Sequence, residues 1–342
     1  MNTATTDRPQ SPGRLVLLDG LRGVAAIGVV LFHAQLSGAG HAFSRGYLFV
    51  DLFFLLSGFV LTLAFEPRFA GGLAATPFLR QRLRRFLPMI AAGAAMGFLA
   101  LLGRDYPLVA CVLALVVSAA MIPLPMATIF PLNPPQWSLM VELIANAVHA
   151  RWLHRMTSAR LLALACACAL GMAAMMARAG DGNLGAGIAQ LPAGLLRAGW
   201  SYTLGIVLAR IWRERRPAPL LDWRIALLLP VPVVMALPFL PLVAWGGDVI
   251  VITVVFPALF WIAASAVPTQ SGERILKTLG AISFPLYAVH FPILLAADRF
   301  GGGEPGRVVG IFAAIAVAAI LARATSQRAS ARRPVPVPLA DA

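Results

Sequence analysis

The sequence contains little charge, and this scarcity excludes most classes of soluble protein. Only 12% of its 342 residues are Asp, Glu, Lys or Arg, whereas 59% are hydrophobic. Soluble globular domains carry about 25% charged residues, roughly twice that share. The mean hydropathy is +0.81. This composition is typical of a polytopic membrane protein, so we expect an all-α bundle of transmembrane helices.

Cysteine and histidine are also scarce. The three cysteines, Cys111, Cys166 and Cys168, lie in apolar segments without the paired spacing of a disulfide framework or of metal ligands. The sequence has five histidines and lacks both a G-x-S-x-G element and a Walker-type phosphate loop. We therefore expect no bound metal, and any chemistry has to take place in or at the membrane.

The positive charge is arranged in short segments between apolar runs. The chain has 28 Lys and Arg against 14 Asp and Glu, a net charge of +14. Arginine-rich connections fall at residues 80–85, 151–160, 210–216 and 323–333. Positive residues concentrate in the cytoplasmic loops of membrane proteins, next to anionic lipid. The charge therefore indicates topology and membrane lipid, and it does not indicate nucleic-acid binding.

Apolar runs occupy most of the chain between residues 15 and 323. They lie at residues 15–36, 50–66, 86–102, 106–122, 136–153, 161–178, 193–211, 224–243, 248–267, 279–297 and 307–323. If both termini and all arginine-rich connections are cytoplasmic, neighbouring connections must be separated by an even number of crossings. Three runs lie between Arg85 and Arg151, so we expect a re-entrant element around residues 106–136, where prolines are dense.

This topology predicts about ten crossings within a membrane domain of residues 15–323. A cytoplasmic segment, residues 1–14, precedes this domain. A basic, Pro-rich and disordered cytoplasmic tail, residues 324–342, follows it. The expected location is a membrane that the chain crosses many times, with both termini in the cytoplasm.

The first two runs carry charges that are expensive inside lipid. Arg22, His33 and Asp51 are ionisable residues in apolar segments, which by default indicate a functional site. Arg22 and His33 are separated by about three helical turns plus 20°, so they share one face, about 16 Å apart. Asp51 begins the next run on the outer side, within reach of His33. We expect this carboxylate to orient the imidazole as a general base.

An R-x-x-R pair, Arg82 and Arg85, precedes the third run. The two guanidinium groups are one helical turn apart and point the same way. Paired arginines match phosphate oxygens bidentately, which favours a grip on an anionic cofactor. Arginines that only set membrane topology would give the same pattern, and the residues alone leave both interpretations open.

The segment 137–142, with the sequence WSLMVE, places polar residues inside another apolar run. Ser138 and Glu142 are four residues apart and share a helix face, next to Trp137. We expect these residues in a substrate pocket. The alternative for Glu142 is a structural ion pair with an arginine such as Arg22.

A later segment, SFPLYAVHFP at residues 283–292, places a tyrosine and a histidine on one helix face. Tyr287 and His290 follow a serine at spacings of four and three. We expect Pro285 and Pro292 to break the helix beside a cavity. Interhelical hydrogen bonding is an equal alternative for each polar residue taken singly.

Taken in order, these segments resemble the motifs of the acyltransferase-3 family of bacterial inner-membrane O-acyltransferases. The resemblance includes LDGLRG with an arginine–ten residues–histidine spacing, V-D-L-F-F-x-L-S-G-F, an R-x-x-R before a proline, W-S-L-x-x-E and S-x-x-x-Y-x-x-H-x-P. In this chain the motifs lie at residues 18–33, 50–59, 82–88, 137–142 and 283–292. Some members carry an esterase-like domain after the membrane part. This sequence stops too soon for one, so we expect a stand-alone member.

The resemblance implies transfer of an acyl group, usually acetyl, from cytoplasmic acyl-CoA to a hydroxyl of a saccharide or another acceptor. It implies that His33 is catalytic with Asp51 as its partner, and that Arg22, Arg82 and Arg85 hold the donor. A single-step transfer and a covalent acyl-histidine relay are both compatible with these residues. The main alternatives are a proton- or anion-coupled transporter or flippase and a non-catalytic partner of an envelope-assembly complex.

Overall fold

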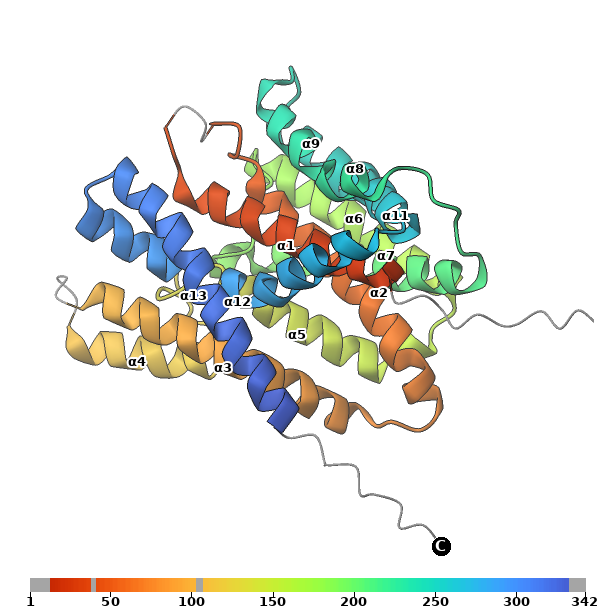
Figure 1. The fold of residues 1–342 in the computed structure, drawn as a ribbon, viewed down its shortest axis with the longest axis horizontal. Coiled ribbons are helices and arrows are strands. Elements are labelled where there is room, and N and C mark those ends of the chain that lie inside the picture. Colours follow the sequence, from red (N-terminus) through yellow and green to blue (C-terminus); the bar gives the residue numbers. More distant parts are fainter. Residues whose placement is uncertain (1–12, 38–40, 103–106, 332–342) are drawn as a thin grey trace, which may run out of the picture.

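The computed structural model describes residues 13–37, 41–102 and 107–331, and these form a bundle of helices without a strand (Figure 1). This confirms the expected all-α class. The α-helices are α1 (Gly13–Ala34), α2 (Phe49–Ala70), α3 (Ala75–Leu101), α4 (Leu108–Ala119), α5 (Gln136–Arg151), α6 (Ser158–Ala179), α7 (Leu191–Glu214), α8 (Trp223–Leu228), α9 (Pro230–Ala236), α10 (Ala244–Ile250), α11 (Phe256–Ser265), α12 (Gln270–Gly301) and α13 (Glu304–Ala331). The shorter elements are η2 (Gly46–Leu48), η3 (Leu153–Arg155), η4 (Ile188–Gln190), η5 (Leu237–Phe239) and the π-helical turn η6 (Val251–Val255).

Seven helices in the described part of the chain are long and apolar enough to cross a membrane. They span Val16–Ala34, Gly46–Ala70, Ala75–Leu101, Ser158–Ala179, Ala244–Ser265, Gln270–Gly301 and Glu304–Ser326. The expected run 224–243 is divided into α8, α9 and η5 and is not one continuous helix. Helix α4 has 12 residues, about 18 Å of length, which is shorter than the hydrocarbon core of about 30 Å.

Local sequence explains where several helices begin and end. Thr157 and Thr269 precede α6 and α12, and their hydroxyl groups accept backbone N–H bonds from Arg160 and Gly272. Both helices end at a glycine in the left-handed conformation, Gly180 for α6 and Gly302 for α12. A residue with a side chain rarely adopts that conformation, so glycine terminates these helices at low cost.

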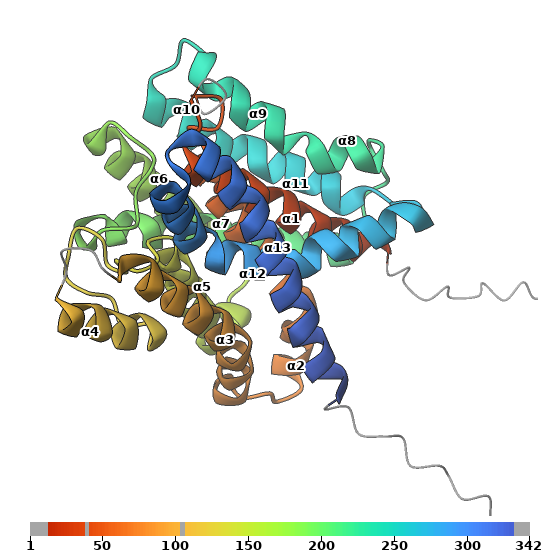
Figure 2. The ribbon, with the colours of Figure 1, turned by 60° about the vertical axis from the view of Figure 1, so that its left-hand side comes forward.

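The bundle is organised around two helix pairs. Helix α1 packs along α12, and α2 packs along α7 (Figures 1 and 2). Close approach in the second pair depends on glycine: a Cβ on Gly58 would overlap the carbonyl oxygen of Tyr202, and one on Gly205 would overlap that of Leu55. Small residues allow helix backbones to approach closely in membranes, where packing drives association. Helices α3 and α13 cover α12 on its other sides.

Helix α12 is continuous through both of its prolines, which corrects the expectation that Pro285 and Pro292 break it. Proline has no N–H, so Pro292 leaves the carbonyl of Ala288, four residues earlier, without its helical partner. The side-chain amide of Asn133 donates to this carbonyl at 2.8 Å. A neighbouring segment therefore satisfies the freed acceptor, as membrane helices with proline require.

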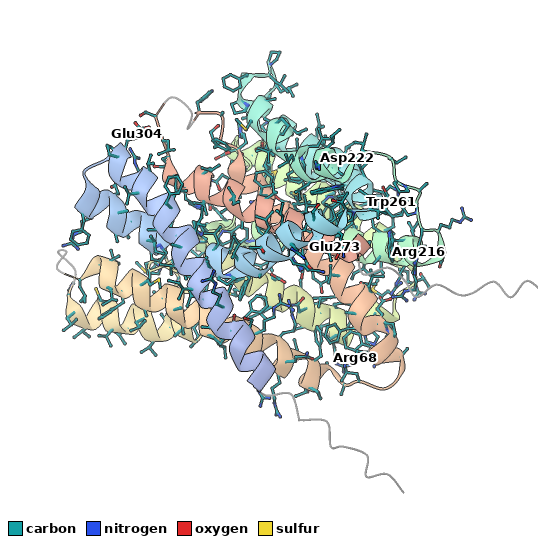
Figure 3. All side chains as sticks on the ribbon, viewed as in Figure 1. Arg68, Arg216, Asp222, Trp261, Glu273 and Glu304 are labelled. Atoms are coloured by element: carbon teal, nitrogen blue, oxygen red, sulfur yellow. The ribbon has the colours of Figure 1, made fainter. Side chains whose placement is uncertain are left out.

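Labelled side chains identify the two ends of the bundle. Arg68 and Arg216 lie at one end, called here the arginine end, and Glu304 lies at the other, called the distal end (Figure 3). The hydroxyl of Ser37 bonds to Glu304, so α1 runs from the arginine end to the distal end. Helix α13 continues to Ala331, so residues 324–331 are helical, although we expected them in a disordered tail. Residues 1–12 and 332–342 lie outside the described residues.

The tight contact between α2 and α7 gives a stability prediction. We expect Gly58→Ala to lower the stability of the detergent-solubilised protein by about 1–3 kcal/mol, because a methyl group there forces two backbones apart. Gly246→Ala is the matched control, since no atom lies within 4 Å of its added Cβ. Thermal unfolding of both variants checks this, and equal stability of the two would contradict the packing argument.

Candidate active site

Arg22, Arg82 and Arg85 converge on one cavity of about 90 Å³ inside the bundle. They come from α1 and α3, and the same cavity is lined by Ser138 and Glu142 of α5. The remaining walls are mostly apolar and come from α2, α3, α5 and α12: Val50, Phe53, Phe54, Ser57, Val60, Leu61, Phe86, Leu139, Ser283, Phe284 and Tyr287. Arg22 and the Arg82/Arg85 pair, predicted from two separate segments of the sequence, therefore face a common space.

Positive charge exceeds negative charge around this cavity. Arg82 Nη2 lies 3.1 Å from Glu142 Oε1, and that oxygen also accepts a 2.6 Å hydrogen bond from the Ser57 hydroxyl. Arg22 pairs with Asp19 on its own helix. Arg85 has no ion pair with an acidic side chain among the described residues. An anion in the cavity would therefore meet guanidinium groups whose charge is only partly neutralised.

The inner wall of the cavity is held by a hydrogen bond between two helices. The hydroxyl groups of Ser138 and Tyr287 are 2.6 Å apart, and they lie 3.1 and 3.3 Å from the carbonyl oxygen of Pro135. Both side chains line the cavity. Trp137, in contrast, does not line it. Its ring packs on the guanidinium of Arg197, 5.7 Å from the ring centroid, so Trp137 lies next to Arg197, and its expected role in a substrate pocket stays a prediction.

His33 contacts His290 and not Asp51. Nδ1 of His33 lies 3.1 Å from Nε2 of His290, and it lies 3.0 Å from the carbonyl oxygen of Val29. His290 is fully buried, and its Nδ1 faces the carbonyl oxygens of Tyr287 at 2.8 Å and Leu286 at 3.2 Å. Neither histidine lines the arginine cavity. The ring of Tyr287, which does, has its centroid 5.8 Å from that of His290.

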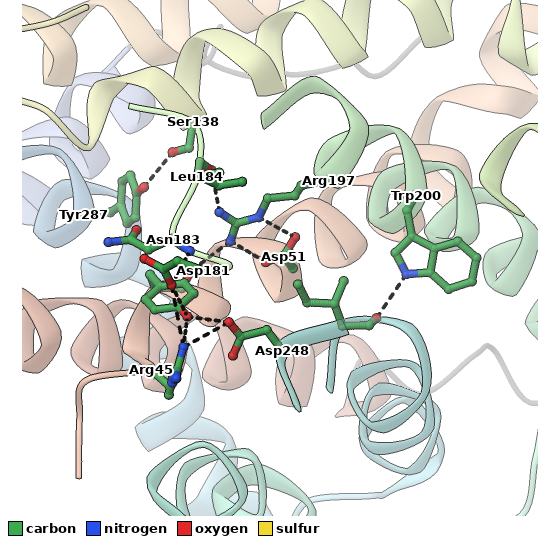
Figure 4. A network of polar contacts seen from close by, with 12 residues as sticks. Arg45, Asp51, Ser138, Asp181, Asn183, Leu184, Arg197, Trp200, Asp248 and Tyr287 are labelled. Carbon is green, nitrogen blue, oxygen red and sulfur yellow. Dashed lines mark hydrogen bonds and ion pairs between the residues drawn. The ribbon is translucent and has the colours of Figure 1, made fainter. Parts of the chain in front are cut away.

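Asp51 forms a buried ion pair with Arg197, which corrects its expected pairing with His33. Both carboxylate oxygens accept from the guanidinium, at 3.2 and 2.6 Å, and both side chains are 1% exposed (Figure 4). Arg197 also donates to the carbonyl oxygens of Leu184 and Tyr47, at 2.7 and 3.2 Å. With both its oxygens occupied by Arg197, Asp51 has no contact with His33.

Arg197 is a residue of this site that the sequence-based prediction did not include. It is an arginine inside the apolar run 193–211, and the rule that singled out Arg22 and Asp51 applies to it equally. Applying the rule to both residues would have suggested an intramembrane pair of opposite charges. The spatial pairing itself depends on α2 lying against α7, which no local pattern indicates.

A comparison with known protein families identifies the family of this chain. Residues 15–323 match the acyltransferase-3 family, which is described as an acyltransferase domain. The chain belongs to this family. It is therefore an acyltransferase, and its apolar helices make it a multi-pass membrane protein. All the site residues above, including Arg197, lie within the matched range.

Two relatives show similarity over parts of the family domain. "Protein 2 in picA locus" of Rhizobium radiobacter is 38% identical over 166 residues, covering 43% of this chain and 86% of that protein. "O-acetyltransferase OatA" of Staphylococcus aureus is 34% identical over 86 residues, covering 25% of this chain and 14% of that much longer protein. No solved structure matches this member of the family.

The buried ion pair gives a prediction about the structural role of Asp51. We expect Arg197→Met to lower stability by about 3–5 kcal/mol, because it leaves a buried carboxylate without its partner. The double variant Asp51→Leu/Arg197→Met should regain most of this loss, since replacing both charges by apolar groups is often neutral. Thermal unfolding in detergent measures both effects.

Lys277→Ala is the control for loss of an ion pair, because Lys277 and its partner Glu273 are solvent-accessible and such pairs contribute about 0–1 kcal/mol. An Arg197→Met variant as stable as Lys277→Ala would refute the structural role of the buried pair.

Proposed function

We propose that this protein transfers an acyl group from acyl-CoA to a hydroxyl group of a saccharide of the cell envelope or of an exported glycan. The observation that carries the proposal is the cavity lined by Arg22, Arg82 and Arg85, with His33 and His290 beyond its inner wall. The likeness to a protein named O-acetyltransferase supports acetyl as the acyl group and oxygen as the acceptor atom.

The donor would enter from the arginine end. The phosphates of CoA carry the negative charge that Arg82 and Arg85 match, and the apolar walls formed by Phe53, Phe86 and Phe284 suit the thioester arm. We place this end in the cytoplasm, where the arginine-rich connections and both termini would lie, with the protein in the bacterial inner membrane.

His290 fixes which nitrogen of His33 acts as the base. Nδ1 of His290 faces only carbonyl oxygens, so Nδ1 carries the proton of this ring and Nε2 of His290 is a hydrogen-bond acceptor. Nδ1 of His33 lies between that Nε2 and the carbonyl oxygen of Val29, so it carries its own proton. In neutral His33, Nε2 is then left with a free lone pair. This assignment follows from the hydrogen-bond partners.

The reaction then needs no other base. His33 Nε2 accepts the proton of the acceptor hydroxyl while the oxygen attacks the thioester carbonyl. The carbon–sulfur bond breaks, and the CoA thiolate takes the proton from His33 to leave as the thiol. His33 returns to its neutral form, and the products are the acyl ester and free CoA.

The donor assignment predicts separate effects of two sets of substitutions. We expect Arg82→Ala/Arg85→Ala to weaken acetyl-CoA binding at least about tenfold, because charged hydrogen bonds to phosphate are lost. His33→Ala should bind acetyl-CoA normally but lower turnover by about 10²–10⁴-fold, the usual contribution of a general base. Binding and slow thioester hydrolysis by the purified protein measure both effects.

The control is Arg80→Ala/Arg84→Ala, which removes the same charge from the same segment, although neither arginine lines the cavity. If this control loses as much acetyl-CoA binding, the segment acts only through its overall positive charge, and the specific role of Arg82 and Arg85 is contradicted. A wild-type protein that neither binds nor hydrolyses any acyl-CoA would disprove the donor assignment and favour the transporter alternative.

The role of His290 is tested by its own pair of variants. His290→Ala should lower the turnover number by about 10–100-fold, the range found when an orienting partner of a functional histidine is removed, with little change in the KM for acetyl-CoA. His290→Gln should recover part of the rate, because its amide oxygen can accept from His33. A wild-type rate for His290→Ala would show that His33 needs no such partner.

A further inference from the structure

A groove between α5, α6 and α7 lies apart from the arginine cavity and has a volume of about 150 Å³. The Tyr202 hydroxyl donates to Asn146 Oδ1 at 3.0 Å and lies 3.0 Å from His149 Nδ1, so it needs no further partner. Water would find few partners in the groove, which therefore suits an apolar ligand. Apart from Tyr202 and Thr203, the lining residues have no polar side-chain group: Val141, Ile144, Ala145, Val148, Leu153, Leu164, Leu195, Ala198 and Gly199.

The groove opens on the outside of the bundle. Each helix contributes one partly exposed lining residue: Ile144 is 41%, Leu164 is 38% and Leu195 is 40% exposed. Only 22% of the apolar stretch of α6 is buried within the protein, so this helix faces the hydrocarbon of the membrane. An apolar cavity of about 150 Å³ binds benzene, so the groove has room for about six carbons of an acyl chain. A chain there would supply the dispersion contacts that an unfilled groove lacks.

The groove reaches the arginine end of the bundle. Arg210, in the part of α7 that leads to Arg216, donates to the carbonyl oxygens of Met156 and His154, at 2.7 and 3.3 Å. The connection between α5 and α6 therefore lies at the arginine end. Leu153, the first residue of η3 in this connection, lines the groove. A lipid whose chain fills the groove would have its head group beside this connection.

Two arginines lie next to the groove at that end. Arg151 follows Val148 by three positions in α5, and Arg160 precedes Leu164 by four positions in α6. Each arginine is thus one helical turn beyond a lining residue, on the same helix face. The guanidinium carbon of Arg151 lies 5.8 Å from the ring centroid of Trp152, which is 58% exposed. Tryptophan is enriched at the level of lipid head groups, which places these residues there.

The charge of these arginines selects the head group. Both are exposed, and neither has an ion pair with an acidic side chain in the part of the chain that the structure describes. Guanidinium groups bind phosphate oxygens through charged hydrogen bonds. Basic residues near the membrane surface attract anionic lipids. A zwitterionic lipid offers the same phosphate but adds a cation close to the two arginines, so an anionic head group fits better.

We infer that the groove binds one anionic phospholipid of the surrounding bilayer, with an acyl chain between α5, α6 and α7 and the phosphate on Arg151 and Arg160. This inference goes beyond the proposed function and does not depend on it. Helix α5 also carries Ser138 and Glu142 of the arginine cavity. A lipid in the groove would therefore support the helix that forms one wall of that cavity.

Native mass spectrometry of the detergent-purified protein tests this inference, with dioleoylphosphatidylglycerol and dioleoylphosphatidylcholine as the anionic and the zwitterionic probe. We expect the wild type to retain one phosphatidylglycerol per chain and to prefer it at least about fivefold over phosphatidylcholine. Arg151→Gln/Arg160→Gln should lower phosphatidylglycerol retention at least about fivefold and remove this preference. Ala145→Phe places a ring in the groove and should lower retention of both lipids by a similar factor, because the chain is displaced.

Two controls match these variants. Arg215→Gln/Arg216→Gln removes the same charge from the same end, and Ala174→Phe adds the same ring at an exposed position of α6 that does not line the groove. Both should retain phosphatidylglycerol like the wild type, and a loss in the controls equal to that in the variants would overturn the site.

Three further results would contradict the inference. Wild-type retention of phosphatidylglycerol in either Arg151→Gln/Arg160→Gln or Ala145→Phe would overturn the groove as the binding site. Equal retention of the two lipids by the wild type would overturn the anionic head group. Glycerophosphoglycerol is the same head group without acyl chains, and we expect it not to displace the lipid at equal concentration. Displacement by it would show a site for a free phosphate compound in place of a lipid.

Discussion

The ion pair between Asp51 and Arg197 is the interaction on which the rest of the site depends. It joins α2 to α7 inside the bundle, where an isolated charge of either sign would be very unfavourable. The remaining N–H groups of Arg197 hold the backbone of Tyr47 and Leu184. The hydroxyl of Tyr47 donates to Asp248, and Leu184 follows Asp181 by three residues. One guanidinium therefore fixes the positions of three chain segments that meet near the end of α1.

A second constraint places His290. Helix α12 carries two prolines, and its continuity depends on acceptors that other segments satisfy, as Asn133 does for Ala288. Because the helix stays regular, Tyr287 and His290 remain on the side that faces the cavity and His33. The carbonyl oxygens of Leu286 and Tyr287 then receive the N–H of His290. A broken helix would have separated the tyrosine from the histidine. The uninterrupted geometry is thus part of how the proposed base obtains its tautomer.

Helical periodicity was sufficient to predict which polar residues share a face, and it failed wherever a partner lay on another helix. The pairing of Arg82 with Arg85, of Ser138 with Glu142 and of Tyr287 with His290 follows from spacings of three or four residues. These faces do meet at the cavity and at His33. The partner of Asp51 was assigned by proximity in sequence, and the residue that binds it lies 146 positions away. Pairing across a bundle depends on the order of helix packing, and a single sequence does not contain that order.

The position of Tyr287 between the lining of the arginine cavity and His290 has a chemical consequence for the proposed reaction. Tyr287 lines the cavity, its hydroxyl is held by Ser138 and the carbonyl oxygen of Pro135, and its ring centroid lies 5.8 Å from that of His290, whereas neither histidine lines the cavity. Under the proposed function, water that enters with the donor would meet Tyr287 before it reaches His33, and this would limit hydrolysis of the thioester. In the proposed reaction the acyl group passes Tyr287 only when it moves toward His33. Under the proposed function, such a barrier would favour the acceptor hydroxyl over water, because an open channel would admit water to the thioester as freely as the acceptor.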